Sequence, residues 1–225
     1  MTVMLESGPA EPALPHNDRG AEINIVLWVL VVLSTIFVGM RVFCKRWTGK
    51  SLWWDDYTLM ASWVCFVADA AFWTLAVGQG FGKHTWDFPM QNIEKTGLFL
   101  SVAGIFALTA IIWSKTSFAV TLLRLTTGRT RAFVWFLLIT TNVFLGLSAL
   151  FNMVQCRPIE KAWRPMVDGT CWDMRTLINY HIFSGVYSAV VDFSLALLPW
   201  PLVLGMSLRR SEKFGIAVAM SMGIL

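Results

Sequence analysis

The sequence predicts an all-α membrane protein. Of its 225 residues, 56% are hydrophobic and only 14% are charged, whereas soluble domains carry about a quarter charged residues. The apolar residues form runs long enough to cross a hydrocarbon core of about 30 Å, which takes about 20 helical residues. Many of the 12 tryptophans lie near the ends of these runs, as aromatic anchors do at membrane interfaces.

Five full-length apolar runs and one short run follow a polar arm. Residues 1–22 contain three prolines and no apolar run, which predicts a disordered extracellular arm and not a signal peptide. The predicted spans are 23–44, 57–79, 98–123, 132–154 and 178–206, with the sixth run at 214–225. Pro199 and Pro201 predict a bend in the fifth span.

The sixth run covers only about 18 Å as a helix, too little to reach the far membrane interface. We therefore expect the chain to be truncated at its C-terminus. At the start of the second span, Asp55 or Asp56 is expected to cap the helix, because a carboxylate there also complements the helix dipole.

The lysines and arginines of the loops predict the orientation. One side of the membrane has tight basic loops that contain Arg41, Lys45, Arg46, Lys50, Arg124, Arg129, Arg131, Arg209, Arg210 and Lys213. Basic residues on the other side are fewer, more widely spread and mixed with acids. The positive-inside rule places the first side in the cytosol and the N-terminus outside. Because the charges form short clusters and not one continuous basic face, the sequence argues against nucleic-acid binding.

The cysteines fall into two groups. Cys156 and Cys171 lie in the loop between the fourth and fifth spans, on the predicted outer side. A disulfide there would close a loop of about 16 residues and stabilise the fold by roughly 3 kcal/mol. We expect this bridge, since the alternative is two free thiols facing an oxidising compartment. Cys44 and Cys65 lie within or at the edge of spans and are expected to be buried apolar thiols.

Three ionisable residues fall inside spans, where each costs a few kcal/mol unless it is paired or hydrated. They are Asp69, Lys115 and Asp192. Polar residues at helical spacing accompany them in three stripes: Thr58, Ser62, Cys65 and Asp69; Thr141, Ser148 and Asn152; and His181, Ser184, Ser188 and Asp192. We expect the stripes to face the interior of the bundle, and Lys115 to pair with Asp192 or Asp69.

These charges have three interpretations. They could hold helices together, line a ligand or signalling pocket, or carry protons or ions, and the sequence favours them in that order. No hydrolase or metalloprotease motif is present. We therefore expect neither an enzyme nor a cofactor.

The loop at 78–84, which includes Gly80, Gly82 and His84, departs from a phosphate-binding loop at its first glycine and at its Ser or Thr position. It predicts a glycine-rich turn at a helix end. His84 and Asp87 without a third ligand do not predict a metal site.

Taken together, these motifs resemble the fungal rhodopsin-domain integral membrane proteins, from about residue 23 to the last. The residues that carry the resemblance are Trp54-Asp55-Asp56-Tyr57, Gly80-Phe81-Gly82-Lys83-His84, Lys115, Cys156-Arg157-Pro158-Ile159, Trp163, Gly169, Cys171, Asp192, Leu198-Pro199-Trp200-Pro201, Arg210, Lys213 and Gly215. The resemblance implies a rhodopsin-like transmembrane domain over 23–225. It also implies a seven-transmembrane-helix bundle, of which five helices and the start of the sixth are present.

The resemblance also directs the functional hypothesis, because the family includes members of secondary-metabolite clusters and receptor-like proteins. Retinal-binding rhodopsins carry their lysine in the last helix, so Lys115, in the third, does not inherit that role. The leading hypothesis is a receptor-like protein of the plasma membrane that senses an extracellular or membrane-soluble small molecule and contacts a cytosolic signalling partner. Basic inner loops such as 124–131 would face that partner or anionic lipid. The alternatives are a transporter or accessory membrane protein of a secondary-metabolite pathway, and an intramembrane enzyme.

Overall fold

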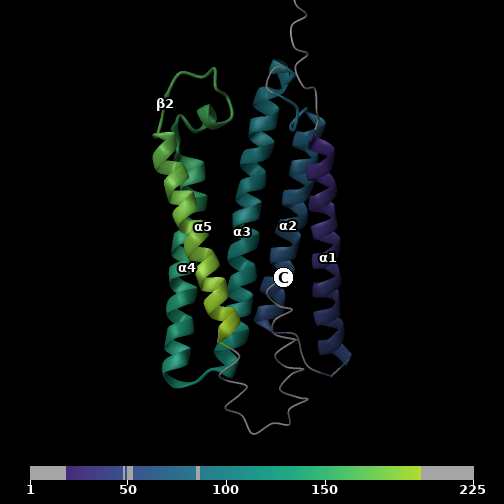
Figure 1. Cartoon of the computed structure of the whole chain (residues 1–225), viewed down its shortest axis with the longest axis vertical. Helices are drawn as coiled ribbons and strands as arrows, with labels where there is room; N and C mark the ends of the chain where they lie inside the picture. The colour runs from purple at the N-terminus through teal and green to yellow at the C-terminus, as the bar shows by residue number, and fades with distance from the viewer. Residues whose placement is uncertain (1–18, 48, 50–52, 85–86, 199–225) are drawn as a thin grey trace, which may run out of the picture.

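Five long helices, each antiparallel to the one before it, dominate the part of the chain that the structure describes. This computed structural model describes residues 19–47, 49, 53–84 and 87–198. The helices are α1 (Gly20–Trp47), α2 (Trp54–Gly78), α3 (Ile93–Leu125), α4 (Gly128–Val154) and α5 (Met174–Leu197) (Figure 1). All five are long and apolar enough to cross a membrane, which agrees with the predicted all-α membrane class.

Each helix begins before its apolar run. α1 begins three residues before the predicted span, and α3 begins five residues before it, at Ile93. The added first turns carry acidic residues, Glu22 in α1 and Glu94 in α3. A hydropathy pattern detects only the part of a helix inside hydrocarbon, whereas the hydrogen-bonded turns extend into the interface. The predictions for 1–18, for 214–225 and for the proline bend at Pro199 and Pro201 lie outside the described residues.

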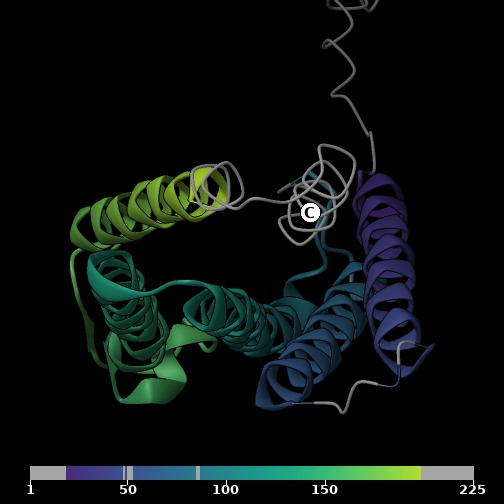
Figure 2. The same ribbon diagram turned by 90° about the horizontal axis from the view of Figure 1, so that it is seen from below.

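The helices follow an arc in chain order. Each packs on its neighbour in sequence, α1 on α2, α2 on α3, α3 on α4 and α4 on α5. Seen from below, α1 and α5 lie at the two ends of this arc, with α3 between α2 and α4 (Figure 2). Helix α3 is therefore the central element of the described part of the bundle.

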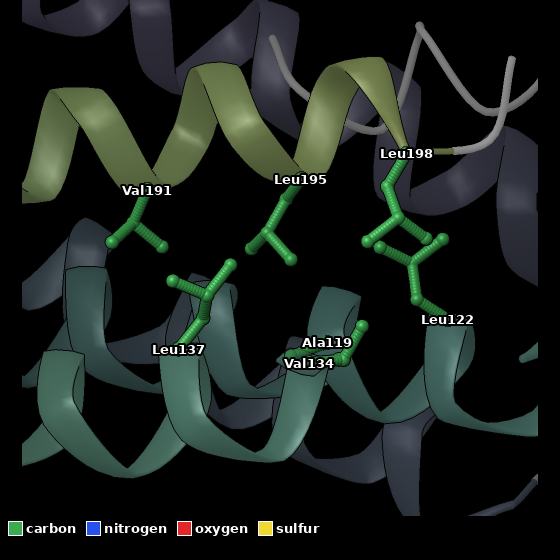
Figure 3. Packing of buried hydrophobic residues seen from close by; sticks show 7 residues of the cluster. All are labelled: Ala119, Leu122, Val134, Leu137, Val191, Leu195 and Leu198. Carbon is green, nitrogen blue, oxygen red and sulfur yellow. The ribbon is translucent and has the colours of Figure 1, made fainter. Parts of the chain in front are cut away.

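A cluster of aliphatic side chains joins α3, α4 and α5 (Figure 3). Its buried members are Ala119, Leu122, Val134, Leu137, Val191, Leu195 and Leu198. The spacing of three and four residues within each helix puts these side chains on one face. Because lipid is as apolar as leucine, the close packing of this cluster, and not transfer from water, holds the three helices together.

Interhelical hydrogen bonds join each pair of neighbours. The indole N–H of Trp28 donates to Thr74 between α1 and α2, at 3.0 Å. The Ser62 hydroxyl donates to the carbonyl of Ala110 between α2 and α3, at 2.7 Å. Asn142 donates to Thr116 between α4 and α3, and Ser148 to Ser184 between α4 and α5. Such bonds contribute on average about 0.6 kcal/mol each in membranes.

The connection from α4 to α5 is a short hairpin. Strands β1 (Cys156–Arg157) and β2 (Thr170–Cys171) pair antiparallel, with the 3₁₀ helix η2 (Ile159–Ala162) between them. The predicted disulfide joins Cys156 to Cys171, which face each other in this register. The expected burial of the other two cysteines is wrong, because Cys44 is exposed and Cys65 is only partly buried. A Cβ on Gly169 would lie 2.4 Å from the carbonyl oxygen of Arg157, so only glycine fits there.

The same hairpin reaches across to the start of α3. The guanidinium of Arg164 pairs with the carboxylate of Glu94 at 3.1 Å. A Cβ on Gly97 would lie 3.2 Å from the carbonyl oxygen of Trp163, so the two segments are in close contact. We call this end of the bundle the disulfide end.

Candidate functional site

A buried group of charges lies at the other end of the bundle, where α2 begins. Asp55 and Asp56 are each only 1% exposed. Arg41 and Lys45 from α1 and Arg124 from α3 are their ionic partners. We call these five residues the acidic-pair cluster. It joins α1, α2 and α3 through one network, since each helix contributes at least one charge.

The distances in this cluster are those of direct ion pairs. The Lys45 ammonium lies 2.6 Å from both carboxylate oxygens of Asp56 and 3.2 Å from Oδ2 of Asp55. Arg41 contacts the same two carboxylates at 3.1 and 3.3 Å. Nη2 of Arg124 lies 2.9 Å from Oδ1 of Asp55. Three cations thus surround two buried anions, which offsets the large cost of burying the carboxylates.

Neutral groups complete the cluster. The Ser117 hydroxyl donates to the backbone carbonyl of Asp55 at 2.6 Å, and the Arg124 guanidinium lies 4.5 Å from the centre of the Trp53 ring. The carboxylate of Asp56 accepts the backbone N–H of Trp53 at 3.2 Å, the bond expected of an acid in a first helical turn. Asp55 binds mainly the cations. Sequence reasoning assigned both acids to capping and missed their ionic partners.

A second ion pair joins α3 to α5. Nζ of Lys115 lies 2.5 Å from Oδ2 of Asp192 and donates to the backbone carbonyl of Ser188 at 3.2 Å. The lysine side chain is 15% exposed and the aspartate side chain 45% exposed. Lys115 precedes Arg124 by nine residues, which is about 13 Å along α3. The pair is therefore inside the spanning part of the bundle, and its carboxylate is much less enclosed than those of the acidic-pair cluster.

Asp69, the other predicted partner of Lys115, lies elsewhere. The Ser62–Ala110 bond fixes the register of α2 against α3. Asp69 is seven residues from Ser62 toward the disulfide end, and Lys115 is five residues from Ala110 toward the opposite end. At 1.5 Å per residue these displacements add to about 18 Å. Of the two partners that the sequence allowed for Lys115, the structure therefore pairs it with Asp192 and not with Asp69.

Asp69 and His181 have surroundings of their own. The Asp69 side chain is buried, and its Oδ1 has no hydrogen-bond partner among the described residues. The His181 ring lies 6.4 Å from that of Tyr180. It precedes Asp192 by eleven residues, about 16 Å along α5. Of the predicted intramembrane residues, the structure thus brings together Lys115, Ser188 and Asp192.

The glycine-rich turn closes the disulfide end of α2. Gly80 and Gly82 have φ angles of +106° and +102°, which side chains rarely adopt. A Cβ on Gly82 would lie 2.5 Å from the backbone nitrogen of Gly20. The carbonyl of His84 accepts the N–H of Asp87 at 2.9 Å. Within the described ranges, no three His, Cys, Asp or Glu side chains form a group that could hold a metal ion.

Comparisons with known proteins agree with this architecture. The chain is 19% identical over 221 residues to "Wortmanamides biosynthesis cluster protein C" of Talaromyces wortmannii; the match covers 94% of this chain and 59% of that protein. The chain thus spans about three fifths of the length of this relative. No solved structure matches the chain significantly. The family model of the fungal rhodopsin domain matches residues 40–225. The chain therefore belongs to the fungal rhodopsin domain family.

Proposed function

We propose that this chain is a receptor-like, multi-pass membrane protein that senses an extracellular or membrane-soluble small molecule. The observation that carries the proposal is the Lys115–Asp192 pair, an ion pair inside the spanning helices whose carboxylate is 45% exposed. Charges inside the membrane are costly and mark functional sites by default. An ion pair that serves only to hold helices together is expected to have an enclosed carboxylate, as Asp55 and Asp56 are.

A ligand at this pair would act on the contact between α3 and α5. Lys115 is the ionic link between these helices, and the aliphatic cluster that joins them begins one helical turn away, at Ala119. A molecule that binds one arrangement of α3 and α5 better than another shifts the population between them. Such a shift at the basic end of the bundle is the signal that we propose a cytosolic partner reads.

A second function is favoured by the relative. The name of the Talaromyces wortmannii protein places it in a biosynthetic cluster. An accessory or transport role in a secondary-metabolite pathway would use the same polar pair, because a lipid-soluble metabolite would meet it within the membrane. A receptor would signal that the molecule is present, whereas a transporter would carry it across the membrane.

We propose that the disulfide end faces the outside of the plasma membrane and that the acidic-pair cluster lies at the cytosolic end. The basic residues Arg46, Arg129 and Arg131 at the latter end support this orientation. A protease site placed in the hairpin near Met166, which is exposed, should be cut in intact cells. If the protease cuts only after the cells are permeabilised, the disulfide end faces the cytosol and the proposed orientation is wrong.

The test of function compares signalling with flux. A strain that lacks the gene is complemented with the natural protein, with Asp192→Asn, or with Arg164→Gln, which removes the exposed ion pair to Glu94. A receptor predicts that Asp192→Asn abolishes the transcriptional response to culture extracts while metabolite export is unchanged, and that Arg164→Gln has neither effect. Altered export with an intact response would support the transport role instead.

We propose further that the pair does no chemistry. Culture metabolites from the Asp192→Asn strain should then contain every product of the natural strain, and only their amounts or location should change. The disappearance of one product together with the accumulation of its precursor would contradict this and indicate an intramembrane enzyme.

A further inference from the structure

On α5, an exposed glycine lies on the same side of the helix as Asp192, about 10 Å away along its axis. Gly185 precedes Asp192 by seven residues, about two helical turns, and so lies on the same face. A Cβ on Gly185 would meet no atom within 4 Å. On α3, Ile111 precedes Lys115 by one turn and is 42% exposed. The face of α5 that carries Asp192 thus continues to an exposed glycine, and the face of α3 that carries Lys115 continues to an exposed apolar side chain.

The groups at the pair retain unused hydrogen-bonding capacity. An ammonium group has three N–H donors, and Lys115 uses two of them, toward Asp192 and the carbonyl of Ser188. The bond to Asp192 engages Oδ2. Within the described part of the chain, Oδ1 of Asp192 accepts no hydrogen bond from another helix, and the Ser188 hydroxyl has no partner on another helix. The pair can thus offer a donor and acceptors to one molecule.

The charge of the site restricts what that molecule can be. Lys115 and Asp192 neutralise each other, so a cation could bind the carboxylate only by displacing a tethered ammonium. An anion would likewise have to displace a tethered carboxylate from Lys115. Tethered partners compete at high effective concentration, and a charged ligand would also lose hydration inside the membrane. A neutral molecule adds hydrogen bonds and leaves the ion pair intact.

We infer that the Lys115–Asp192 pair binds a neutral, lipid-soluble molecule that carries a carbonyl, amide or hydroxyl group. Its polar group hydrogen-bonds to Lys115 and Asp192, and its apolar part lies along Gly185 and Ile111. This inference rests on the proposed function, because it names the class of small molecule that the same site would sense.

The test uses three photoreactive dodecyl probes that differ only in their head group: a carboxamide, an ammonium and a carboxylate. The full chain is placed in phosphatidylcholine nanodiscs, and labelled peptides are mapped by mass spectrometry. We expect the carboxamide probe to label peptides covering 108–118 and 183–195. The variant Gly185→Leu places a side chain where the apolar part of the probe would lie, and we expect it to lower this labelling by at least about tenfold.

The matched control is Gly146→Leu on α4, because a Cβ on Gly146 also meets no atom within 4 Å. This variant should label as the natural protein does. The double variant Lys115→Met with Asp192→Leu keeps the site neutral but removes its hydrogen bonds, and it should also lose labelling. Circular dichroism and gel filtration check that each variant remains folded.

Two results would overturn the inference. One is carboxamide labelling that Gly185→Leu leaves unchanged, and the other is stronger Gly185-dependent labelling by the ammonium or carboxylate probe. Failure of the proposed function is distinguishable from either result. If Asp192→Asn changes neither signalling nor metabolite flux in cells, the proposed function is contradicted. The class of ligand is decided separately, by which of the three probes labels the protein.

Discussion

The acidic-pair cluster and the Lys115–Asp192 pair hold charge between the helices in different ways. The acidic-pair cluster encloses Asp55 and Asp56 almost completely and surrounds them with three cations from two other helices. The Lys115–Asp192 pair has one cation for one anion, and its carboxylate is 45% exposed. The first arrangement fixes three helices in place. The second neutralises a charge but leaves hydrogen-bonding groups available, and the substitutions below separate these two roles.

The largest effect is expected from Asp55→Asn. It removes one of two anions and leaves Arg41, Lys45 and Arg124 with only Asp56 in a buried site. Breaking a buried ionic group in this way costs about 3–5 kcal/mol. Equilibrium unfolding in mild detergent measures the change. The control is Asp168→Asn, an exposed loop acid that should change stability by less than about 0.5 kcal/mol. Equal effects at the two positions would show that the cluster does not stabilise the fold.

The next largest effect on stability is expected at the Lys115–Asp192 pair, where a double-mutant cycle compares this pair with the acidic-pair cluster. Lys115→Met and Asp192→Asn should each destabilise the protein by about 1–3 kcal/mol, because each leaves one unpaired charge within the membrane. The double variant should cost less than the sum, since it leaves no charge behind. At the cluster, Asp55→Asn with Asp56→Asn should cost more than either single change, because three cations remain. Additive losses at Lys115 and Asp192 would contradict the pairing.

A smaller effect is expected from Arg124→Gln. This guanidinium is the ionic partner of Oδ1 of Asp55, but its side chain is 39% exposed, so solvent already screens the pair. We expect a loss of about 1 kcal/mol, which unfolding in detergent can measure. Arg131→Gln, a change at an exposed residue, serves as the control. A loss as large as that of Asp55→Asn would mean that Arg124 is the main counter-charge of the pair.

The smallest loss of stability is expected from removing a hydrogen bond between two uncharged side chains, and it gives a reference for the losses at the ion pairs. Ser148→Ala removes the hydrogen bond between α4 and α5 to Ser184, and we expect a loss of about 0.6 kcal/mol. Its control is Ser194→Ala, because the Ser194 hydroxyl donates to Val190 within its own helix. If Ser148→Ala cost as much as Lys115→Met, the ion pair would have no advantage over an uncharged contact between helices.

The sequence predicted the positions of the helices better than the contacts between their side chains. Apolar runs located all five described helices, because hydrocarbon thickness imposes a length that composition records directly. The disulfide was also predictable, since Cys156 and Cys171 share one loop. Helix starts were predicted three to five residues late, because the polar first turns of α1 and α3 carry no hydropathy signal.

Which side chains pair across two helices depends on how the helices are aligned with each other, and a single sequence does not specify this alignment. For Lys115, helical spacing allowed either Asp69 or Asp192 as the partner. The Ser62–Ala110 hydrogen bond fixes the register of α2 on α3, and this register puts Asp69 about 18 Å from Lys115 along the helix axes. Asp55 and Asp56 matched a helix cap, and that local explanation hid their contacts with α1 and α3. Two adjacent acids next to the tight basic loop after α1 were the signal that could have predicted the cluster.

Helix α3 contributes to both charged sites, and this fixes its rotational phase. Lys115 and Arg124 are nine residues apart, which is two and a half turns, so they project about 180° apart around the helix axis. One side is tied to Asp192 and the other to Asp55. Inserting or deleting one residue between them would turn one site by about 100° relative to the other. The segment 115–124 should therefore tolerate substitution far better than any change of length.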